Sequence, residues 1–141
     1  MLQTVRKVKK FYRLQLSKTI SIPSMTFPIA LRKHNNMIYA MGYHSGEILR
    51  INLHSGENEI VVNGLVRPRS FDFIGDEIVV ISSANEKIKI YTDKGQITAA
   101  LTQEECDLFD LSGKILLCAG DEEIHVISPE NEKLYTYDSN L

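Results

Sequence analysis

A tetrapeptide that occurs twice contains the first candidates for chemistry in this sequence. His-Ser-Gly-Glu stands at 44–47 and again at 54–57, so that two histidines lie ten residues apart. Histidine nitrogens can bind zinc, but Ser and Gly in such runs also form tight turns. The strand pattern around them places the two copies at opposite ends of one strand. We therefore expect two turns here and no metal site.

Two arginines that flank a proline are the second set of candidates. Arg67 and Arg69 enclose Pro68, whose ring fixes φ and stiffens the loop. Their planar guanidinium groups suit a phosphate or a carboxylate, which they can bind through two parallel hydrogen bonds. The alternative is that they pair with acids of the following repeat, such as Glu104 or Glu105. We name Arg67 and Arg69 as candidate partner-binding residues.

The N-terminal region is strongly basic. Residues 1–46 contain eight Lys or Arg side chains and no acid, whereas the rest of the chain carries the other eight and all eighteen acids. Such an asymmetry indicates a basic surface that meets something acidic, either RNA or the acidic surface of another protein. The candidate contact residues are Arg6, Lys7, Lys9, Lys10 and Arg13.

Signals of catalysis are absent from the sequence. It contains no nucleophile elbow, phosphate-binding glycine loop, dinucleotide fingerprint or EF-hand-like carboxylate loop. Its two cysteines, Cys106 and Cys118, form no CxxC pair, and we expect both to be reduced core residues. We therefore predict a protein that is not an enzyme, with no catalytic residue, no metal, no cofactor and no small-molecule substrate.

One segment type recurs four times and determines the expected fold. The copies at 12–17, 49–54, 88–93 and 124–129 are offset by 37, 39 and 36 residues, and each alternates apolar with polar side chains as a half-buried strand does. A second strand follows each copy, at 19–22, 59–62, 96–101 and 133–137. Two more strands precede each of the last three copies, at 28–31 and 37–43, at 70–73 and 77–83, and at 107–111 and 115–119.

A period near 40 residues with four strands per unit is typical of a β-propeller. We therefore predict an all-β fold, a partial propeller of four-stranded antiparallel blades in one domain, with a β-sandwich as the alternative. The expected parts are a basic extension at 1–10, an outer half-blade at 11–23, and blades at 24–63, 64–102 and 103–141.

The repeats also resemble those of the WD-repeat family. Residues 70–101 combine an inner strand, a hairpin, an Ile-x-Ile-Tyr strand and an Asp-x-Gly turn, and residues 107–134 follow the same plan. The chain lacks the Trp-Asp dipeptide and the Gly-His pair that are usual in that family. The resemblance implies a protein-interaction scaffold, a subunit of a larger complex.

Three and a half blades do not close a ring, so we expect apolar faces at both ends of the series. Two copies would close awkwardly because both half-blades would be outer ones. Another polypeptide supplies the missing blades, or the chain is part of a longer one, or the N-terminal strands serve another purpose. We expect an interaction scaffold completed by or docked on other protein chains in an obligate or homo-oligomeric contact. The alternatives are an RNA-contacting module and a metal-dependent hydrolase or lyase of propeller type.

The expected location is intracellular, most simply the cytoplasm. The basic N-terminus without acids also resembles a mitochondrial transit peptide. No apolar run approaches the ~18 residues needed to span a bilayer, so we expect no membrane span.

Overall fold

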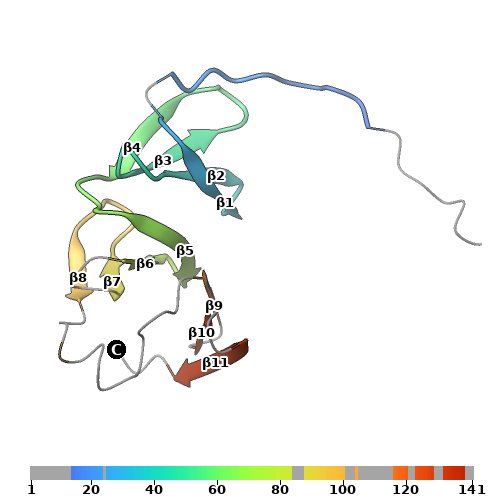
Figure 1. Ribbon diagram of the computed structural model, residues 1–141. Coiled ribbons are helices and arrows are strands. Elements are labelled where there is room, and N and C mark those ends of the chain that lie inside the picture. Colours follow the sequence, from blue (N-terminus) through green and yellow to red (C-terminus); the bar gives the residue numbers. More distant parts are fainter. Residues whose placement is uncertain are drawn as a thin grey trace, which may run out of the picture.

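The computed structural model describes residues 14–23, 25–83, 88–100, 104, 116–120, 123–128 and 132–138. Its strands form three antiparallel sheets that follow one another along the chain (Figure 1). Within these ranges there is no helix that is long and apolar enough to cross a membrane.

Each sheet is one unit of the predicted repeat. Blade 1 has the order β1 (Pro28–His34), β2 (Met37–Gly42), β3 (Glu47–Asn52) and β4 (Asn58–Val62). Blade 2 has the order β5 (Pro68–Ile74), β6 (Glu77–Ser82), β7 (Ile88–Tyr91) and β8 (Ile97–Ala100). Blade 3 contains β9 (Leu116–Gly120), β10 (Glu123–Ser128) and β11 (Lys133–Asp138).

Tight turns join the strands where the sequence offers residues that tolerate positive φ. Asn35 and Asn36, with φ of 49° and 62°, connect β1 to β2, and Gly75, with φ of 60°, stands at the matching place between β5 and β6. Such two-residue connections match the right-handed twist of paired strands. The short turns keep consecutive strands adjacent, so each blade is a simple up-and-down sheet.

The blades pack face to face. Phe71, Ile78 and Val80 of blade 2 lie in one core cluster with Met41 and Ile48 of blade 1. On the opposite face of blade 2, Val79, Ile81, Ile88 and Ile90 form a second cluster with Leu117, Ile124 and Val126 of blade 3. Each fully buried Ile, Val or Phe contributes roughly 1.5–3 kcal/mol relative to an exposed position. Blade 2 is therefore buried on both faces, as the continuous apolar run of β6 requires.

This series of stacked antiparallel sheets, two of them four-stranded, confirms the predicted all-β partial propeller. A sandwich would have two facing sheets, whereas here three sheets follow in sequence. Strands occupy eleven of the predicted positions. The predicted strand at 107–111 lies outside the described residues, and the blade boundaries that we assigned remain predictions.

The prediction of an outer half-blade at 11–23 is contradicted by the structure and needs correction. Residues 14–23 contain no strand, and residues 11–13 lie outside the part that the structure describes. Instead, Ile20, Ile22 and Met25 pack on an apolar cluster of blade 1 formed by Ala40, Leu49 and Ile51. The segment packs its alternating, half-buried isoleucines on that apolar face instead of pairing as a strand.

We call residues 14–25 the strap. Lys18 donates hydrogen bonds to the carbonyl oxygens of Leu53 and His54, in the turn after β3. Leu14 and Leu16 are exposed, and the blue trace in Figure 1 runs over blade 1 and then away from it. The strap thus covers one face of blade 1 through its second half only.

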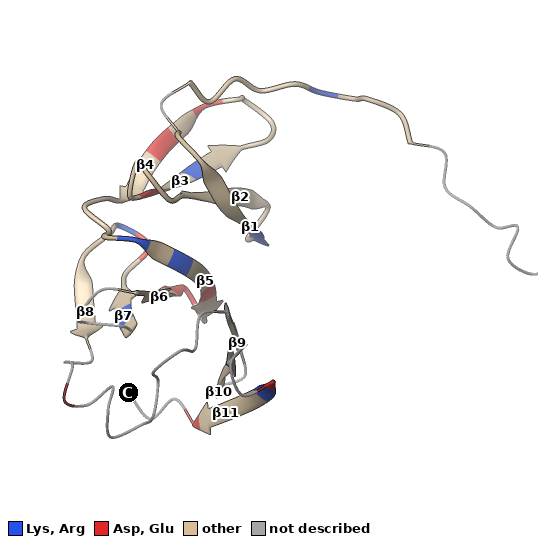
Figure 2. Cartoon of the chain, in the orientation of Figure 1, with Lys and Arg blue, Asp and Glu red and all other residues tan. Residues whose placement is uncertain are grey.

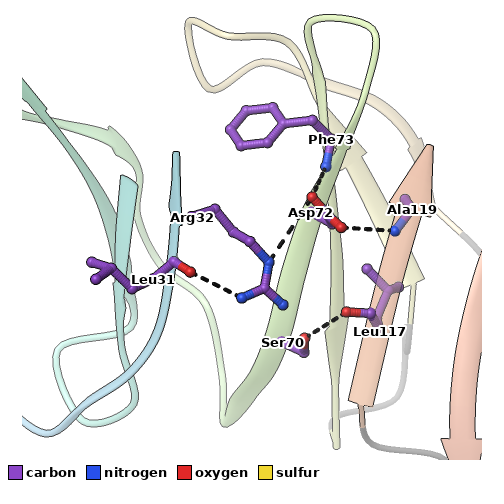
Figure 3. A network of polar contacts seen from close by, with 7 residues as sticks. All are labelled: Leu31, Arg32, Ser70, Asp72, Phe73, Leu117 and Ala119. Atoms are coloured by element: carbon purple, nitrogen blue, oxygen red, sulfur yellow. Dashed lines mark hydrogen bonds and ion pairs between the residues drawn. The ribbon is translucent and has the colours of Figure 1, made fainter. Parts of the chain in front are cut away.

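Polar side chains of the inner strands also link the blades (Figure 3). Asp72 on β5 accepts hydrogen bonds from the Phe73 amide and the Ala119 amide of β9, both at 2.9 Å. Arg32 on β1 approaches the same carboxylate at 4.0 Å. Ser70 donates to the Leu117 carbonyl oxygen at 3.0 Å. One carboxylate therefore contacts all three blades.

A second polar link joins blades 1 and 2 at the β1–β2 end. The His34 ring stacks on Phe73 with centroids 4.0 Å apart and contacts the Asp76 carboxylate at 3.2 Å. Hydrogen bonds from His34 and then from Asn35 lower the pKa of the Asp76 carboxyl. Asp76 is exposed, so this contact orients the hairpin ends and adds little stability.

We expect Asp72→Asn to lower the free energy of unfolding by about 1–3 kcal/mol, because an amide cannot accept both backbone hydrogen bonds with the strength of a charged acceptor. Denaturant unfolding measures the change. Asp76→Asn, at an exposed position, is the matched control and should change it by less than about 0.5 kcal/mol. Equal losses in both variants would contradict the role given to Asp72.

Candidate protein-interaction surface

Four side chains gather where the turn before β1 meets the connection between β2 and β3. The rings of Phe27 and His44 lie 5.0 Å apart, those of Phe27 and Tyr43 5.9 Å, and those of Tyr43 and His44 5.2 Å. The Arg69 guanidinium lies over the Tyr43 ring, 5.2 Å from its centroid. We call Phe27, Tyr43, His44 and Arg69 the loop-face cluster.

The cluster is open to solvent. Phe27 is 61% exposed, His44 and Arg69 are exposed, and Tyr43 is half-buried. Val66, in the loop before β5, is 59% exposed. That loop is anchored beside the cluster, because the Leu65 amide donates to the Gly46 carbonyl oxygen at 2.9 Å. An aromatic and arginine surface of this kind is typical of the residues that dominate protein–protein binding.

The backbone holds Phe27 and Arg67 in the same unusual conformation. Both precede a proline that begins the first strand of a blade, and both have positive φ, 56° for Phe27 and 50° for Arg67. Each carbonyl accepts a hydrogen bond from across the hairpin, from the Tyr43 amide at 2.8 Å and from the Ser83 amide at 3.2 Å. A bulge follows in each blade.

Positive φ in a bulky residue costs of order 1–3 kcal/mol and is most often kept at functional sites. Glycine or asparagine would satisfy the backbone at lower cost. The two strained positions present a large exposed side chain each, at matching places in consecutive blades. The same backbone feature, repeated in consecutive blades, therefore places both exposed side chains at the same end of the blades.

The structure treats the predicted contact residues unequally. Arg69 joins the loop-face cluster, and Arg67 is exposed on the adjoining loop. Neither guanidinium forms an ion pair with an acid of the described residues, Glu104 included. Glu105, the other acid of the alternative pairing, lies outside the described residues. The remaining candidates, Arg6, Lys7, Lys9, Lys10 and Arg13, lie outside the described residues.

Sequence reasoning missed the aromatic part of the cluster. Phe27-Pro28 matches Arg67-Pro68 at an offset of 40 residues, and this match was the available signal. Tyr43 and His44 follow β2 directly, where the connection between β2 and β3 begins. Their proximity to Phe27 depends on the antiparallel pairing of Pro28 with Gly42.

The duplicated His-Ser-Gly-Glu segments form turns at the two ends of β3, as predicted. His44 contributes to the cluster at one end, and His54 lies at the other. No group of three or more His, Cys, Asp or Glu side chains that would suit a metal ion occurs among the residues searched, which are those that the structure describes.

A hollow of about 500 Å³ with a mostly polar set of lining residues lies near the far end of β3. The Arg50 guanidinium hydrogen-bonds the Glu59 carboxylate through Nε at 2.9 Å and through Nη2. The bond to Glu59 raises the pKa of Arg50. Asn52 accepts from the His54 and Ser55 amides at 2.8 and 3.1 Å. These polar groups satisfy one another's hydrogen bonds, so we assign the hollow a structural role in the turn after β3 and no ligand.

Comparisons with known proteins concern the fold alone. No family model matches the sequence, and no curated protein matches it. Among solved structures, the chain is similar to the computationally designed Ika4 protein, with a TM-score of 0.55, 14% identity, and 79% of this chain and 65% of that one covered. It is also similar to the N-terminal domain of Nup159, with a TM-score of 0.54 and 11% identity, and 79% of this chain and 27% of that one are covered.

The chain thus spans 65% and 27% of these two structures. The Nup159 domain is a β-propeller, which agrees with the arrangement of the three blades. The class that the fold defines is therefore a partial β-propeller with an aromatic and arginine surface at one end of its blades.

We expect Arg67→Gly to leave the free energy of unfolding unchanged or to raise it by up to about 1 kcal/mol, because glycine adopts positive φ without strain. Arg69→Gly, two residues later inside β5, should lower it by about 0.5–1 kcal/mol. Thermal unfolding of both variants gives the comparison. If Arg67→Gly lowered the free energy of unfolding as much as Arg69→Gly does, the claim that the Arg67 backbone is strained would be contradicted.

Proposed function

We propose that this protein is an interaction scaffold that binds a protein partner through the loop-face cluster. The observation that carries the proposal is the exposed packing of Phe27, Tyr43 and His44, with Arg69 stacked on Tyr43. Its end blades, in this proposal, are covered by strands from outside the three blades. The resemblance of residues 70–101 to WD repeats supports the same class of function.

Exposed apolar side chains favour a protein partner over RNA at this surface. Phe27 is 61% and Val66 59% exposed, and such side chains bind other proteins by burying apolar area. A partner with one or two carboxylates beside apolar side chains would suit the pair Arg67 and Arg69 and the face of Phe27. The basic segment at 1–13 keeps RNA contact as an alternative for that end of the chain.

The enzyme alternative has less support in the described chain. In a propeller-type hydrolase, a channel carboxylate would hold a metal ion, and Asp72 is the inner-strand carboxylate seen here. Both of its oxygens already accept backbone hydrogen bonds, and it lies near Arg32. Those contacts suit a structural role in joining blades.

Site-specific crosslinking tests the proposal. A photoreactive benzophenone side chain at position 27 keeps an aromatic group on the cluster, and the same group at position 97 is the matched control, because Ile97 is 58% exposed on β8 of the middle blade. In an extract of the source organism, we expect one discrete protein adduct from position 27 and none from position 97.

Arg69→Ala in the same background should reduce the adduct several-fold, since the guanidinium braces Tyr43. Adducts of equal pattern from both positions would contradict the proposal. A product from position 27 whose added mass is removed by nuclease would instead establish a nucleic-acid partner.

A further inference from the structure

The strap ends beside the loop-face cluster. Its last residue, Met25, is followed by Thr26 and then by Phe27. The Thr26 amide donates to the Ser45 hydroxyl oxygen at 3.5 Å, and the Phe27 carbonyl oxygen accepts a hydrogen bond from the Tyr43 amide at 2.8 Å. The segment that covers blade 1 therefore leads directly into the exposed aromatic ring of the proposed binding surface.

Blade 2 presents Arg67 through the same backbone arrangement but with a different anchor. At an offset of 40 residues, Leu65 and Arg67 match Met25 and Phe27. Leu65 is half-buried and packs on the core cluster between blades 1 and 2. Met25 is half-buried and packs on the apolar cluster under the strap. Each exposed side chain thus follows an apolar anchor by two residues, and the anchor of Phe27 belongs to the strap.

A buried carboxylate lies on the face that the strap covers. Gly42 pairs with Glu47 across the β2–β3 hairpin, and a Cβ atom on Gly42 would lie 3.1 Å from the Met25 side chain. Paired residues of antiparallel strands direct their side chains to the same face, so Glu47 also points to the side of Met25. Glu47 is 7% exposed, and its Oε1 has no hydrogen-bond partner among the described residues. Buried polar groups normally have such a partner, so this oxygen disfavours the packed strap.

The contacts that hold the strap are modest. Ile20 and Ile22 are only half-buried. Lys18, whose ammonium group donates to the turn after β3, is exposed, and such a hydrogen bond adds little stability because water can replace it. Phe27 has positive φ, which is disfavoured for a bulky residue. The strain at Phe27 and the unpaired oxygen of Glu47 therefore both oppose the packed strap.

We infer that the strap controls the partner-binding surface by positioning Phe27. While the strap is packed on blade 1, the Phe27 ring lies against Tyr43 and His44. Release of the strap frees Phe27, and the surface loses an exposed apolar ring. Arg67 and Arg69 stay in place, because they belong to β5 and the loop before it, where Figure 2 shows blue.

This inference rests on the proposed function, because it describes how binding at the loop-face cluster is regulated. A partner that contacts the Phe27 ring as well as the two arginines binds tightly only while the strap is packed on blade 1. By linkage, the bound partner stabilises the packed strap to the same extent. The position of Phe27 is measurable without a partner, so failure of the inference and failure of the proposed function are distinguishable.

Hydrogen exchange of the Tyr43 amide measures the position of Phe27, because this amide donates to the Phe27 carbonyl oxygen. We expect Met25→Ser to raise the exchange rate of the Tyr43 amide about tenfold or more, since the variant removes the apolar anchor beside Phe27. An unchanged rate at Tyr43 would overturn the inference.

Two other amides are matched controls for the Met25→Ser variant. The Ser83 amide donates to the Arg67 carbonyl oxygen, the equivalent bond in blade 2, and the Asn52 amide donates to the Glu57 carbonyl oxygen at the far end of β3. Both exchange rates should be unchanged. Equal acceleration at Tyr43, Ser83 and Asn52 would mean general loosening of the chain and would also overturn the inference.

Ile20→Ser/Ile22→Ser tests whether the strap acts as one unit. The exchange rate of the Tyr43 amide should rise as it does in Met25→Ser, although the two isoleucines lie farther along the strap from Phe27. Both are half-buried in a segment without strand structure, so circular dichroism should show the same fold. Acceleration in Met25→Ser alone would reduce the effect to a local anchor and overturn control by the strap.

Glu47→Met should act in the opposite direction. Methionine is of similar length and has no buried oxygen that lacks a partner, so the packed strap gains stability. We expect the exchange rate of the Tyr43 amide to fall several-fold. No decrease would overturn the claim that the strap opens and closes in the unmodified chain.

Crosslinking from position 66 connects the strap to partner binding. Val66 is 59% exposed on the loop that Leu65 anchors, so a benzophenone side chain there is placed independently of the strap. In the extract we expect a protein adduct from position 66, reduced several-fold by Ile20→Ser/Ile22→Ser. An undiminished adduct overturns the inference alone, whereas no adduct from position 66 or position 27 of the unmodified strap contradicts the proposed function and the regulation with it.

Discussion

A β-blade with apolar side chains on both faces is stable only where something covers each face. Blade 2 meets this condition fully, because Ile78 and Val80 point toward blade 1 and Val79 and Ile81 point toward blade 3. The blades at the two ends have one neighbour each in the described structure. Burial of apolar area is the dominant favourable term in folding, so the packing of the strap on blade 1 meets part of this condition.

The two ends meet the constraint in different ways. At blade 1, Ile20, Ile22 and Met25 pack on β2 and β3, and Lys18 fixes the strap to the turn after β3. At blade 3, the open face has His125 hydrogen-bonded to Thr136 at 2.8 Å, where blade 2 has isoleucine and valine.

Most of the fold was predictable from the sequence, because alternation and turn residues act locally. The continuous apolar run at 77–83 predicted a strand, and β6 occupies Glu77–Ser82 with its apolar side chains buried on both faces. The region at 11–23 failed because its alternation is equally compatible with a strand and with an extended segment lying on an apolar face. Only the packing of Ile20 and Ile22 on Ala40 and Leu49 distinguishes the two.

The candidate surface was predictable in part. Arg67 and Arg69 stood out because they flank a proline, but nothing local signals that Arg69 stacks on Tyr43. That contact joins β5 of blade 2 to the connection after β2 in blade 1. The positive φ of Phe27 and Arg67 likewise depends on hydrogen bonds across each hairpin. Contacts between blades arise from tertiary packing, which a single sequence does not display.

Hydrogen exchange of the Ile20→Ser/Ile22→Ser double variant tests the central claim that the strap covers an otherwise open blade face. If it does, the amides of β2 and β3 should exchange about tenfold faster or more than in the unmodified chain, because two apolar contacts with that face are lost. The amides of β6 and β7, covered by blades 1 and 3, should be unchanged. Unaltered exchange in β2 and β3 would contradict the account.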